Sequence, residues 1–351
     1  MFLIKKKFFN QVVLNQKLDL NKLLKEKKRP IKVYSFMIAL NTQKVSVISP
    51  VYKAETIIHE LVKRIEENLQ NLVADYEIIL IEDSSPDNSW KVIEQVFKIN
   101  SKVKGVQLSK NFGQHNAISC GLDLADGDLV IVMDCDLQHD PTEFKRFFEK
   151  MVKDDSDLVF GIHKERKHSF LKNITAQIYY VIYNALSEIP SYSFKGELSG
   201  FVLMKRNVVD ELVKIREKGS HFLLNLRIVG FNYSTLEIKH LERYEGESSY
   251  TLMRLIKHAV DGITAHSTKL LRLSIYMGLF MSLLSLVFAG ITIYKYLFAK
   301  ILPGFTSLIT IIVFLAGATM VMLGIIGLYL GKVFDQVKNR PLYHISKILK
   351  K

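Results

Sequence analysis

The chain is poor in cysteine and in proline, and each scarcity excludes a class of protein. Of 351 residues, two are cysteine and seven are proline. Two cysteines, Cys120 and Cys135, are too few for a disulfide scaffold and are typical of a reducing compartment. So few prolines, with eighteen glycines, exclude collagenous and low-complexity chains. With 48% hydrophobic and 24% charged residues, the chain is too apolar to be disordered and too charged to be mainly a membrane bundle.

Charge is absent from two long stretches, and this absence predicts membrane helices. Residues 273–294 and 301–331 contain no Asp, Glu, Lys or Arg. A bilayer core of about 30 Å needs about 20 apolar helical residues, so each stretch is long enough to cross it. Two adjacent runs of this length are not typical of buried core helices. The sequence therefore predicts a transmembrane hairpin over 272–331, with helices at about 273–295 and 305–331.

Basic residues around this hairpin predict its orientation. The short connection between the two helices holds only Lys295 and Lys300. Basic residues cluster beyond the other ends of the helices, namely Arg254, Lys257, Lys269, Arg272, Lys332, Lys338, Arg340 and Lys347. Because Lys and Arg are retained on the cytoplasmic side, we expect the large N-terminal part and both termini to lie in the cytoplasm.

The net charge of +13 is concentrated at the two ends of the chain. Residues 1–44 hold eleven basic and two acidic residues, and residues 332–351 hold six basic and one acidic residue. The remainder, 45–331, is nearly neutral, with 31 basic and 32 acidic residues. This distribution indicates membrane topology and lipid contact rather than nucleic-acid binding. We expect 332–351 to be a basic cytoplasmic tail.

The basic arm formed by residues 1–44 admits three interpretations. It is a solvated and partly disordered segment, or it lies on anionic lipid, where each basic residue contributes about 1 kcal/mol. In the third interpretation Met37 is the biological start, because folded sequence begins only at Val45. No export signal is visible, since the first four residues run directly into Lys5, Lys6 and Lys7.

Short apolar runs alternate with helical patterns between residues 45 and 160. The expected strands are 45–48, 76–81, 103–108 and 129–133, and the expected helices are 56–72, 89–97 and 117–124. Apolar strands separated by helices predict an α/β fold with a mainly parallel sheet covered on both faces. Ligands of such sheets bind beyond the carboxyl ends of the strands, which is where the polar motifs of this chain fall.

Two carboxylates follow the fourth expected strand. Asp134 and Asp136 stand at positions i and i+2 after an apolar run, where both can offer oxygens to one divalent cation. Mg²⁺ and Mn²⁺ take oxygen ligands, and Mg²⁺ in particular shares them with substrate phosphates. We expect Cys135 to be a small packed residue and His139 to order the turn rather than to bind metal.

Polar residues also follow the second and third expected strands. Glu82 and Asp83 are suited to hydrogen bonds with a nucleobase and a ribose. Either Asp87 or Asn88 is expected to cap the next helix. Lys110 follows the third strand and is a candidate for a phosphate contact.

Several segments together resemble glycosyltransferase family 2. They read SVISPVYKAETI, EIILIEDSSPDNS, LSKNFGQHNAISCGLDLADGDLVIVMDCDLQHDP, RYEGESSY and GLYLGKVFDQVKNRPLY, and they run from about Val45 to Ile345. The chain is most similar to the membrane-anchored, polyisoprenyl-phosphate-utilising branch, which includes dolichol-phosphate mannose synthase and bacterial lipid-linked glucosyltransferases. The resemblance implies a GT-A catalytic domain over 45–250, a nucleotide-diphospho-sugar donor, Mg²⁺ or Mn²⁺, and inversion at the anomeric carbon. It also implies a bacterial inner membrane.

The resemblance also implies roles for individual residues. The nucleoside would be held by Pro50, Tyr52, Glu55 and Asp83, the metal and diphosphate by Asp134 and Asp136, and Gln138 would line the sugar site. The catalytic set is therefore Asp134, Asp136 and Gln138.

The chain departs from the lipid-phosphate branch at several positions. Many members carry Gly-Asp-Phe-Arg-Leu where this chain reads Ser199-Gly200-Phe201-Val202-Leu203. Ser249 replaces a usual Lys, and His163 replaces a common Arg. A phosphate acceptor needs cations, and Arg is the best bidentate partner. The remaining candidates are Arg166, Arg206, Arg227 and Arg243.

Three functions stay open on the sequence alone. In the first, the acceptor is a polyisoprenyl phosphate such as undecaprenyl phosphate, which is already mostly ionised near neutral pH and needs little deprotonation. In the second, the acceptor is a sugar hydroxyl of a lipid-linked intermediate, and Glu197, Asp140 or Glu247 would have to act as general base. In the third, the chain is a non-catalytic membrane scaffold, against which the intact Asp134 and Asp136 argue. A homo-oligomer is compatible with all three.

Two amphipathic segments complete the expected organisation. Apolar residues fall at helical spacing near 170–187 and again over 251–271. Core packing is the usual role of such stripes, but next to a transmembrane hairpin a helix lying in the membrane interface is equally expected. We hypothesise that both helices seat the catalytic domain on the membrane.

Overall fold

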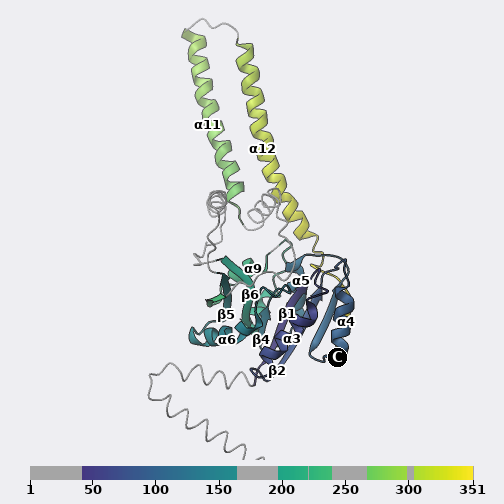
Figure 1. The fold of residues 1–351 in the computed structure, drawn as a ribbon. Coiled ribbons are helices and arrows are strands. Elements are labelled where there is room, and N and C mark those ends of the chain that lie inside the picture. Colours follow the sequence, from purple (N-terminus) through teal and green to yellow (C-terminus); the bar gives the residue numbers. More distant parts are fainter. Residues whose placement is uncertain (1–41, 164–196, 220, 239–266, 299–303, 351) are drawn as a thin grey trace, which may run out of the picture.

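The computed structural model describes residues 42–163, 197–219, 221–238, 267–298 and 304–350. They form an α/β domain from which two long helices extend as a pair (Figure 1). The expected helix near 170–187 lies outside the described residues, as do most of the expected helix 251–271 and nearly all of the basic arm.

Eight strands form one mixed sheet. They are β1 (Lys44–Val51), β2 (Asp75–Glu82), β3 (Val103–Leu108), β4 (Leu129–Val132), β5 (Leu158–His163), β6 (Glu197–Lys205), β7 (Tyr233–Ile238) and β8 (Ile345–Leu349). Their order in the sheet is β7-β5-β6-β4-β1-β2-β3-β8. Strands β1 to β4 pair in parallel, as do β5 and β7, whereas β6 and β8 run antiparallel to their neighbours. The predicted mainly parallel α/β sheet is confirmed.

Helices cover both faces of this sheet. The helices of the domain are α3 (Ile58–Leu69), α4 (Ser89–Ile99), α5 (Gln114–Leu124), α6 (Phe144–Lys153), α8 (Arg206–Leu212) and α9 (Phe222–Ile228), with a 3-10 turn η1 (Pro141–Glu143) before α6. Buried side chains of α3, α4 and α6 join one core cluster, and those of α5, α8 and α9 join the other. The predicted helices 56–72, 89–97 and 117–124 match α3, α4 and α5 with shifted ends.

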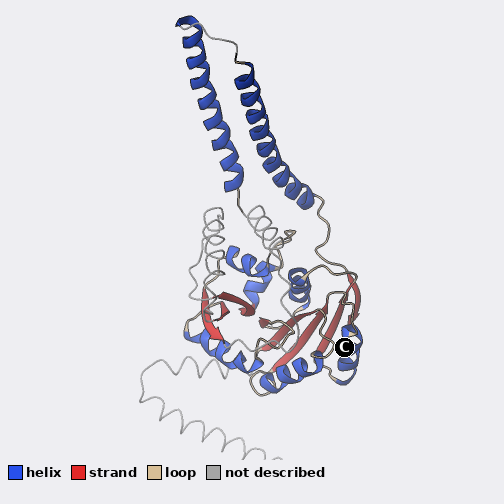
Figure 2. Cartoon of the chain, turned by 45° about the horizontal axis from the view of Figure 1, so that its top comes forward, coloured by secondary structure: helices blue, strands red, loops and turns tan. Residues whose placement is uncertain are grey.

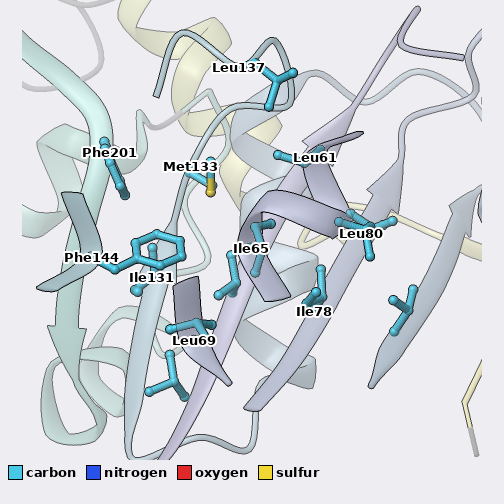
Figure 3. Close-up of a cluster of buried hydrophobic side chains, with 14 of the residues drawn as sticks. Leu61, Ile65, Leu69, Ile78, Leu80, Ile131, Met133, Leu137, Phe144 and Phe201 are labelled. Carbon is cyan, nitrogen blue, oxygen red and sulfur yellow. The ribbon is translucent and has the colours of Figure 1, made fainter. Parts of the chain in front are cut away.

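The first core cluster shows why α3 forms where it does. Its buried residues follow a helical spacing and include Leu61, Ile65 and Leu69, which leaves charged residues on the opposite face. In Figure 3 these three side chains lie over the sheet among residues of β2 and β4, with Ile78 and Ile131 on the facing strands. Because helices cover both faces of the sheet, β1, β2 and β4 lie in the interior of the domain. These strands are parallel, so their carboxyl ends meet at one edge of the sheet.

The two long helices are α11 (Lys269–Phe298) and α12 (Phe305–Val337). Both are long and apolar enough to cross a membrane, and the apolar windows within them are almost entirely unburied. Figure 2 shows them side by side and pointing away from the sheet. At their base, the Tyr329 hydroxyl donates to the Ser267 carbonyl at 2.7 Å. The predicted helices 273–295 and 305–331 are thus present and extend further toward the domain.

The residues of the predicted basic tail, 332–351, include the end of a helix and a strand. Helix α12 continues to Val337, and β8 then pairs antiparallel with β3 at the edge of the sheet. Residues 332–337 of the predicted basic cytoplasmic tail thus belong to α12 and Ile345–Leu349 to the sheet, and their location in the cytoplasm stays a prediction. The short strand Ile345–Leu349 is largely exposed, so it carries no apolar run that would mark it in the sequence.

Candidate active site

The loop after β4 carries the two predicted metal carboxylates at the carboxyl edge of the sheet. The Met133 amide donates to the Ile48 carbonyl at 3.0 Å, so the chain leaves the sheet directly after this residue. The Asp134 carboxylate is one-third exposed. One Asp136 oxygen accepts a hydrogen bond from the Gln138 amide at 3.1 Å. Both carboxylates therefore stand in a tight turn that begins where a buried strand ends.

His139 orders this turn, as expected from the sequence. Its Nδ1 accepts the Asp134 amide at 3.1 Å, which assigns the proton to Nε2. Nε2 in turn contacts Ser199 Oγ on β6 at 2.6 Å, and Ser199 Oγ also accepts the Phe201 amide at 3.1 Å. The imidazole is buried and stacks on the Phe201 ring at 5.1 Å. The buried histidine thus connects the Asp134 loop with strand β6.

The donor set at Asp134 and Asp136 fits a hard divalent cation that completes its shell with substrate. Across the residues that the structure describes, no three His, Cys, Asp or Glu side chains form a metal cluster. Two carboxylates without a protein cage are typical of Mg²⁺ sites that use phosphate oxygens and water as further ligands. Burial raises the pKa of the Cys135 thiol to about 12, which keeps it protonated and unsuited to metal binding.

Gln114 reaches Asp134 from a different loop. This residue is the first of α5, and its Nε2 donates to Asp134 Oδ1 at 2.6 Å. The contact joins the β3–α5 loop to the carboxylate loop. Sequence reasoning missed Gln114, although a polar side chain at the first position of a helix that follows a parallel strand is a signal for a site residue.

Asp83 anchors the same β3–α5 loop. It is 3% exposed, and its two oxygens accept the Phe112 amide at 2.7 Å and the Gly113 amide at 2.8 Å. Burial raises the pKa of the Asp83 carboxyl, and these two bonds oppose the rise. Burial likewise raises the pKa of the Glu82 carboxyl, which accepts the Ser85 amide. In this structure both acids organise loops, and their contacts with a nucleobase and a ribose stay a prediction.

The β1–α3 and β2–α4 loops are joined by reciprocal hydrogen bonds. The Glu55 amide donates to Asp87 Oδ2 at 3.3 Å, and the Asn88 amide donates to Glu55 Oε2 at 2.8 Å. The Lys53 amide donates to Ser85 Oγ at 2.8 Å. Asp87 Oδ1 also accepts the amide of Ser89, the first residue of α4, whereas the N-cap residue Asn88 makes no side-chain capping bond. The two loops consequently form one rigid wall of the site.

Backbone strain is concentrated in these loops. Lys53, Ser84 and Leu137 each have a positive φ, of 54°, 51° and 59°, in the loops after β1, β2 and β4. Non-glycine residues are uncommon in this region of φ/ψ space and persist where the surroundings hold them. Three of the five non-glycine residues with positive φ in the described part of the chain therefore lie in loops at this sheet edge, and the other two are Asp155 and Asn339.

The structure brings most predicted donor-site residues to this edge. Pro50 is buried near the end of β1, and Tyr52 follows β1 with 45% of its surface exposed. Lys110 is exposed after β3, with Nζ 5.1 Å from the centre of the Phe112 ring. Gln138 is half-buried in the carboxylate loop. Together with Glu55, Glu82, Asp83, Asp134 and Asp136, these residues occupy the ends of four neighbouring strands.

The acceptor candidates are not brought together. Arg206 begins α8, where its guanidinium donates to the carbonyls of Ala125 and Gly127 just before β4, at the opposite edge of the sheet. It therefore supports the fold and does not reach the site. Arg227 lines a small cavity with Leu158, at the amino end of β5, and is likewise away from Asp134. Arg166, Arg243 and the candidate base Glu247 lie outside the described residues.

One departure from the family pattern, Gly200, and two candidate bases, Asp140 and Glu197, lie among the described residues, whereas Ser249 lies outside them. Gly200 lies in β6 with its Cα directed at Asp134, since a Cβ there would stand 3.5 Å from both carboxylate oxygens. Asp140, a candidate base, caps η1 by accepting the Thr142 amide at 3.0 Å. Glu197, another candidate, is the first residue of β6 and pairs with His163. The position of Gly200 beside Asp134 shows that this departure falls within the site itself.

Comparisons with known proteins agree with this geometry. Residues 46–213 match the family described as Glycosyl transferase family 2. The chain is similar to the uncharacterized glycosyltransferase YkcC of Bacillus subtilis, with 34% identity over 86% of this chain and 93% of that protein. It is also similar to undecaprenyl-phosphate 4-deoxy-4-formamido-L-arabinose transferase of Proteus mirabilis, with 30% identity over 87% of this chain and 94% of that protein.

A third relative is the SfII prophage-derived bactoprenol glucosyl transferase of Shigella flexneri, with 31% identity over 87% of this chain and 98% of that protein. These alignments span nearly the whole length of each relative, and the family match covers the strands that carry Asp83, Asp134 and Gly200. The α/β domain has the GT-A architecture. The chain therefore belongs to glycosyltransferase family 2, and it is a glycosyltransferase.

Proposed function

We propose that the enzyme transfers a sugar from a nucleotide-diphospho-sugar to a polyisoprenyl phosphate such as undecaprenyl phosphate, with inversion at the anomeric carbon. The reaction takes place at the cytoplasmic face of the bacterial inner membrane and serves envelope polysaccharide or glycolipid synthesis. One observation carries the proposal. The Asp134 and Asp136 loop lies at the same edge of the sheet to which the chain returns directly from the apolar helix α12.

The lipid acceptor is supported by this arrangement and by two relatives. The names of the Proteus mirabilis and Shigella flexneri relatives specify undecaprenyl phosphate and bactoprenol as acceptors, with two different sugars. A lipid-linked acceptor is confined to the membrane surface, so a site beside membrane-spanning helices meets it without dissociating from the bilayer. The same names give no common sugar, and the sugar of this enzyme is therefore left unspecified.

Residues of this chain have distinct proposed roles. Asp134 and Asp136 would hold Mg²⁺ or Mn²⁺, which would supply Lewis-acid neutralisation of the leaving diphosphate. Pro50, Tyr52, Glu55 and Asp83 would border the nucleoside, Glu82 supporting them from the end of β2. Lys110 would meet a phosphate and Gln138 the sugar. These side chains line one sheet edge, as a donor extended across several strand ends requires.

The transfer needs little acid-base chemistry from the protein. An oxygen of the acceptor phosphate attacks the anomeric carbon while the bond from that carbon to the diphosphate oxygen breaks, and the nucleoside diphosphate leaves with the electron pair. A phosphomonoester has its second pKa near 6, so the attacking oxygen is already mostly ionised at neutral pH. Arg166 and Arg243 remain as proposed cations for this phosphate, since Arg206 and Arg227 lie elsewhere.

Transfer to a sugar hydroxyl of a lipid-linked intermediate is the second candidate, and Gly200 favours it. The resemblance implies that many lipid-phosphate members of the family carry an acid at this position, which in this chain would face Asp134. A hydroxyl acceptor would require a general base, for which Glu197 and Glu247 are the candidates after Asp140 is assigned to capping η1.

A donor and acceptor panel tests the proposal. Membranes containing the full chain are incubated with Mn²⁺ and UDP-, GDP- or dTDP-sugars, with and without undecaprenyl phosphate. The lipid product is then separated and identified by its mass in a mass spectrometer. We expect one donor to glycosylate undecaprenyl phosphate and Asp136→Asn to lower the rate at least 100-fold. Product formed only on a glycosylated lipid would establish the second candidate. Release of nucleotide from no donor would contradict both.

A further inference from the structure

The segment after α12 runs from the membrane helix to the active-site edge of the sheet. We call residues 338–350 the C-terminal strap. Asn339, with φ of 44°, turns the chain after α12, and asparagine tolerates this conformation well. The strap then forms β8, whose residues pair with Gly105 to Leu108 of β3. Just before β8, the His344 carbonyl accepts the Ser109 amide at 2.9 Å, at the carboxyl end of β3.

Side-chain contacts fix the strap to the body of the domain. The Tyr343 hydroxyl donates to Asp123 Oδ2 of α5 at 2.5 Å. Arg216 holds the same carboxylate with both terminal nitrogens, at 2.8 and 2.7 Å. Burial raises the pKa of the Tyr343 hydroxyl above its ordinary value, which keeps it protonated as a donor. A bidentate arginine and a tyrosine on one carboxylate restrict the geometry more strongly than any single contact.

The end of α12 is held by the same region. The side-chain amide of Gln336 donates to the Arg216 carbonyl at 3.2 Å and accepts the Lys218 amide at 3.1 Å. Lys218 Nζ also donates to the Asp335 carbonyl at 3.0 Å. The membrane helix is therefore docked on the domain immediately before the strap begins.

The β3–α5 loop lies between the strap and the metal carboxylates. On one side the Asp83 carboxylate accepts the amides of Phe112 and Gly113, and the next residue, Gln114, donates to Asp134. On the other side the Phe112 ring lies 6.0 Å from the His344 ring and under Lys110 Nζ. The loop that presents both Lys110 and Gln114 thus depends on the strap for one of its two supports.

We propose that Tyr343 and His344 are positioning residues for the donor, which act by holding the β3–α5 loop so that Lys110 and Gln114 meet the nucleotide diphosphate. The proposal rests on the proposed donor site. The C-terminal strap would then support the nucleotide site, and the affinity for the donor would depend on how the strap packs on the domain. A strap that only covered the sheet edge would affect stability without affecting the donor.

Paired substitutions at His344 test the ring contact. Full-length protein in nanodiscs is titrated by calorimetry with UDP, GDP and dTDP in the presence of Mn²⁺, without any lipid acceptor. We expect His344→Ala to weaken binding of the preferred nucleotide about fivefold and His344→Phe, which keeps a ring beside Phe112, to restore it. Lys347→Ala, on β8 but beside Trp90, is the matched control and should bind as the wild type does.

Tyr343→Phe tests the anchor to Asp123. We expect a rise of three- to tenfold in the donor KM with kcat within twofold of the wild type, because the loop is less well placed before binding but reaches the same bound geometry. Thermal unfolding of all variants separates a donor effect from a loss of fold. Unchanged nucleotide affinity in His344→Ala and Tyr343→Phe would overturn the inference while leaving the proposed function intact. Binding of no nucleotide to the wild type would refute both.

Discussion

A Cβ atom at Gly200 would stand 3.5 Å from each carboxylate oxygen of Asp134. This distance is an ordinary van der Waals contact, so a small side chain fits at position 200. A carboxylate placed there would lie close to the Asp134 carboxylate. The identity of residue 200 therefore sets the charge beside Asp134, a proposed metal ligand.

Gly200→Asp is expected to destabilise the metal-free enzyme and to increase its response to Mn²⁺. Two carboxylates about 5 Å apart repel by about 3 kcal/mol at an effective dielectric of 20. Partial exposure of Asp134 reduces this to roughly 1–2 kcal/mol, and a bound cation reverses the sign. Thermal unfolding with and without Mn²⁺ measures the difference. Gly200→Ala is the neutral control, and an identical Mn²⁺ shift in both variants would contradict the prediction.

Glu77 is expected to stabilise the domain in a pH-dependent way. It is buried, and it accepts the Ser46 hydroxyl at 2.5 Å and the Asp126 amide at 2.8 Å, with Lys104 Nζ at 2.6 Å. Burial raises the pKa of this carboxyl, but the hydrogen bonds from Lys104, Ser46 and Asp126 outweigh burial and hold the pKa below its ordinary 4.5. A lowered folded-state pKa contributes stability above the unfolded pKa, and this stability is lost as pH falls through the folded pKa.

Glu77→Gln should therefore cost about 1–3 kcal/mol at pH 7, because it leaves buried donors without a charged acceptor. The difference from wild type should shrink below pH 4.5. Urea unfolding at pH 7 and at pH 4 gives both values. The control is Glu60→Gln, which breaks an exposed helix pair with Arg64 and should leave the free energy of unfolding essentially unchanged. Equal losses in the two variants would show that burial of Glu77 has no consequence.

Gly121 is expected to tolerate no side chain. A Cβ there would approach Ile48 Cγ2 to 2.3 Å, where α5 packs on β1. Overpacking of a filled core typically costs about 1–3 kcal/mol, and we expect Gly121→Ala to lower the free energy of unfolding by this amount. In an Ile48→Ala background the same change should cost close to nothing, because the clashing methyl is gone. A double-mutant cycle in which the effects of Gly121→Ala and Ile48→Ala on the free energy of unfolding simply add would contradict this packing.

The orientation of the hairpin can be measured with single cysteines. Burial raises the pKa of both native thiols, Cys120 and Cys135, to about 12, so they should react slowly with maleimides. Gly304→Cys, between α11 and α12, should label with a membrane-impermeant maleimide from outside the cell. Lys350→Cys should label only after permeabilisation. The reverse pattern would place the catalytic domain outside the cytoplasm.

The parallel part of the sheet was predictable because burial on both faces leaves apolar runs such as that of β4. The placement of Asp134 and Asp136 at the carboxyl edge of the sheet was predictable because both directly follow that run. Contacts between loops were not predictable from the sequence. The hydrogen bond from Gln114 to Asp134, for example, depends on how the loops after β3 and β4 are arranged relative to each other. The same limit applies to Arg206, whose carbonyl partners lie far from it in sequence.

Strand β8 could not be predicted for a different reason. It is a short, exposed edge strand, and it pairs with β3 across a sequence separation that includes both long helices. Neither apolar alternation nor a nearby turn marks it. The proposed positioning residues Tyr343 and His344 were hidden with it, although the resemblance to the family continues through this segment.

The pairing of β8 with β3 also sets an order of assembly. Strand β3 is synthesised before α11 and α12, whereas its edge partner emerges only after both helices. Until the residues that follow α12 have been synthesised, one side of β3 presents unpaired backbone groups, and exposed edges of this kind favour aggregation. Completion of the sheet is therefore coupled to synthesis of both apolar helices, and a chain truncated before Ile345 would keep an open edge at β3.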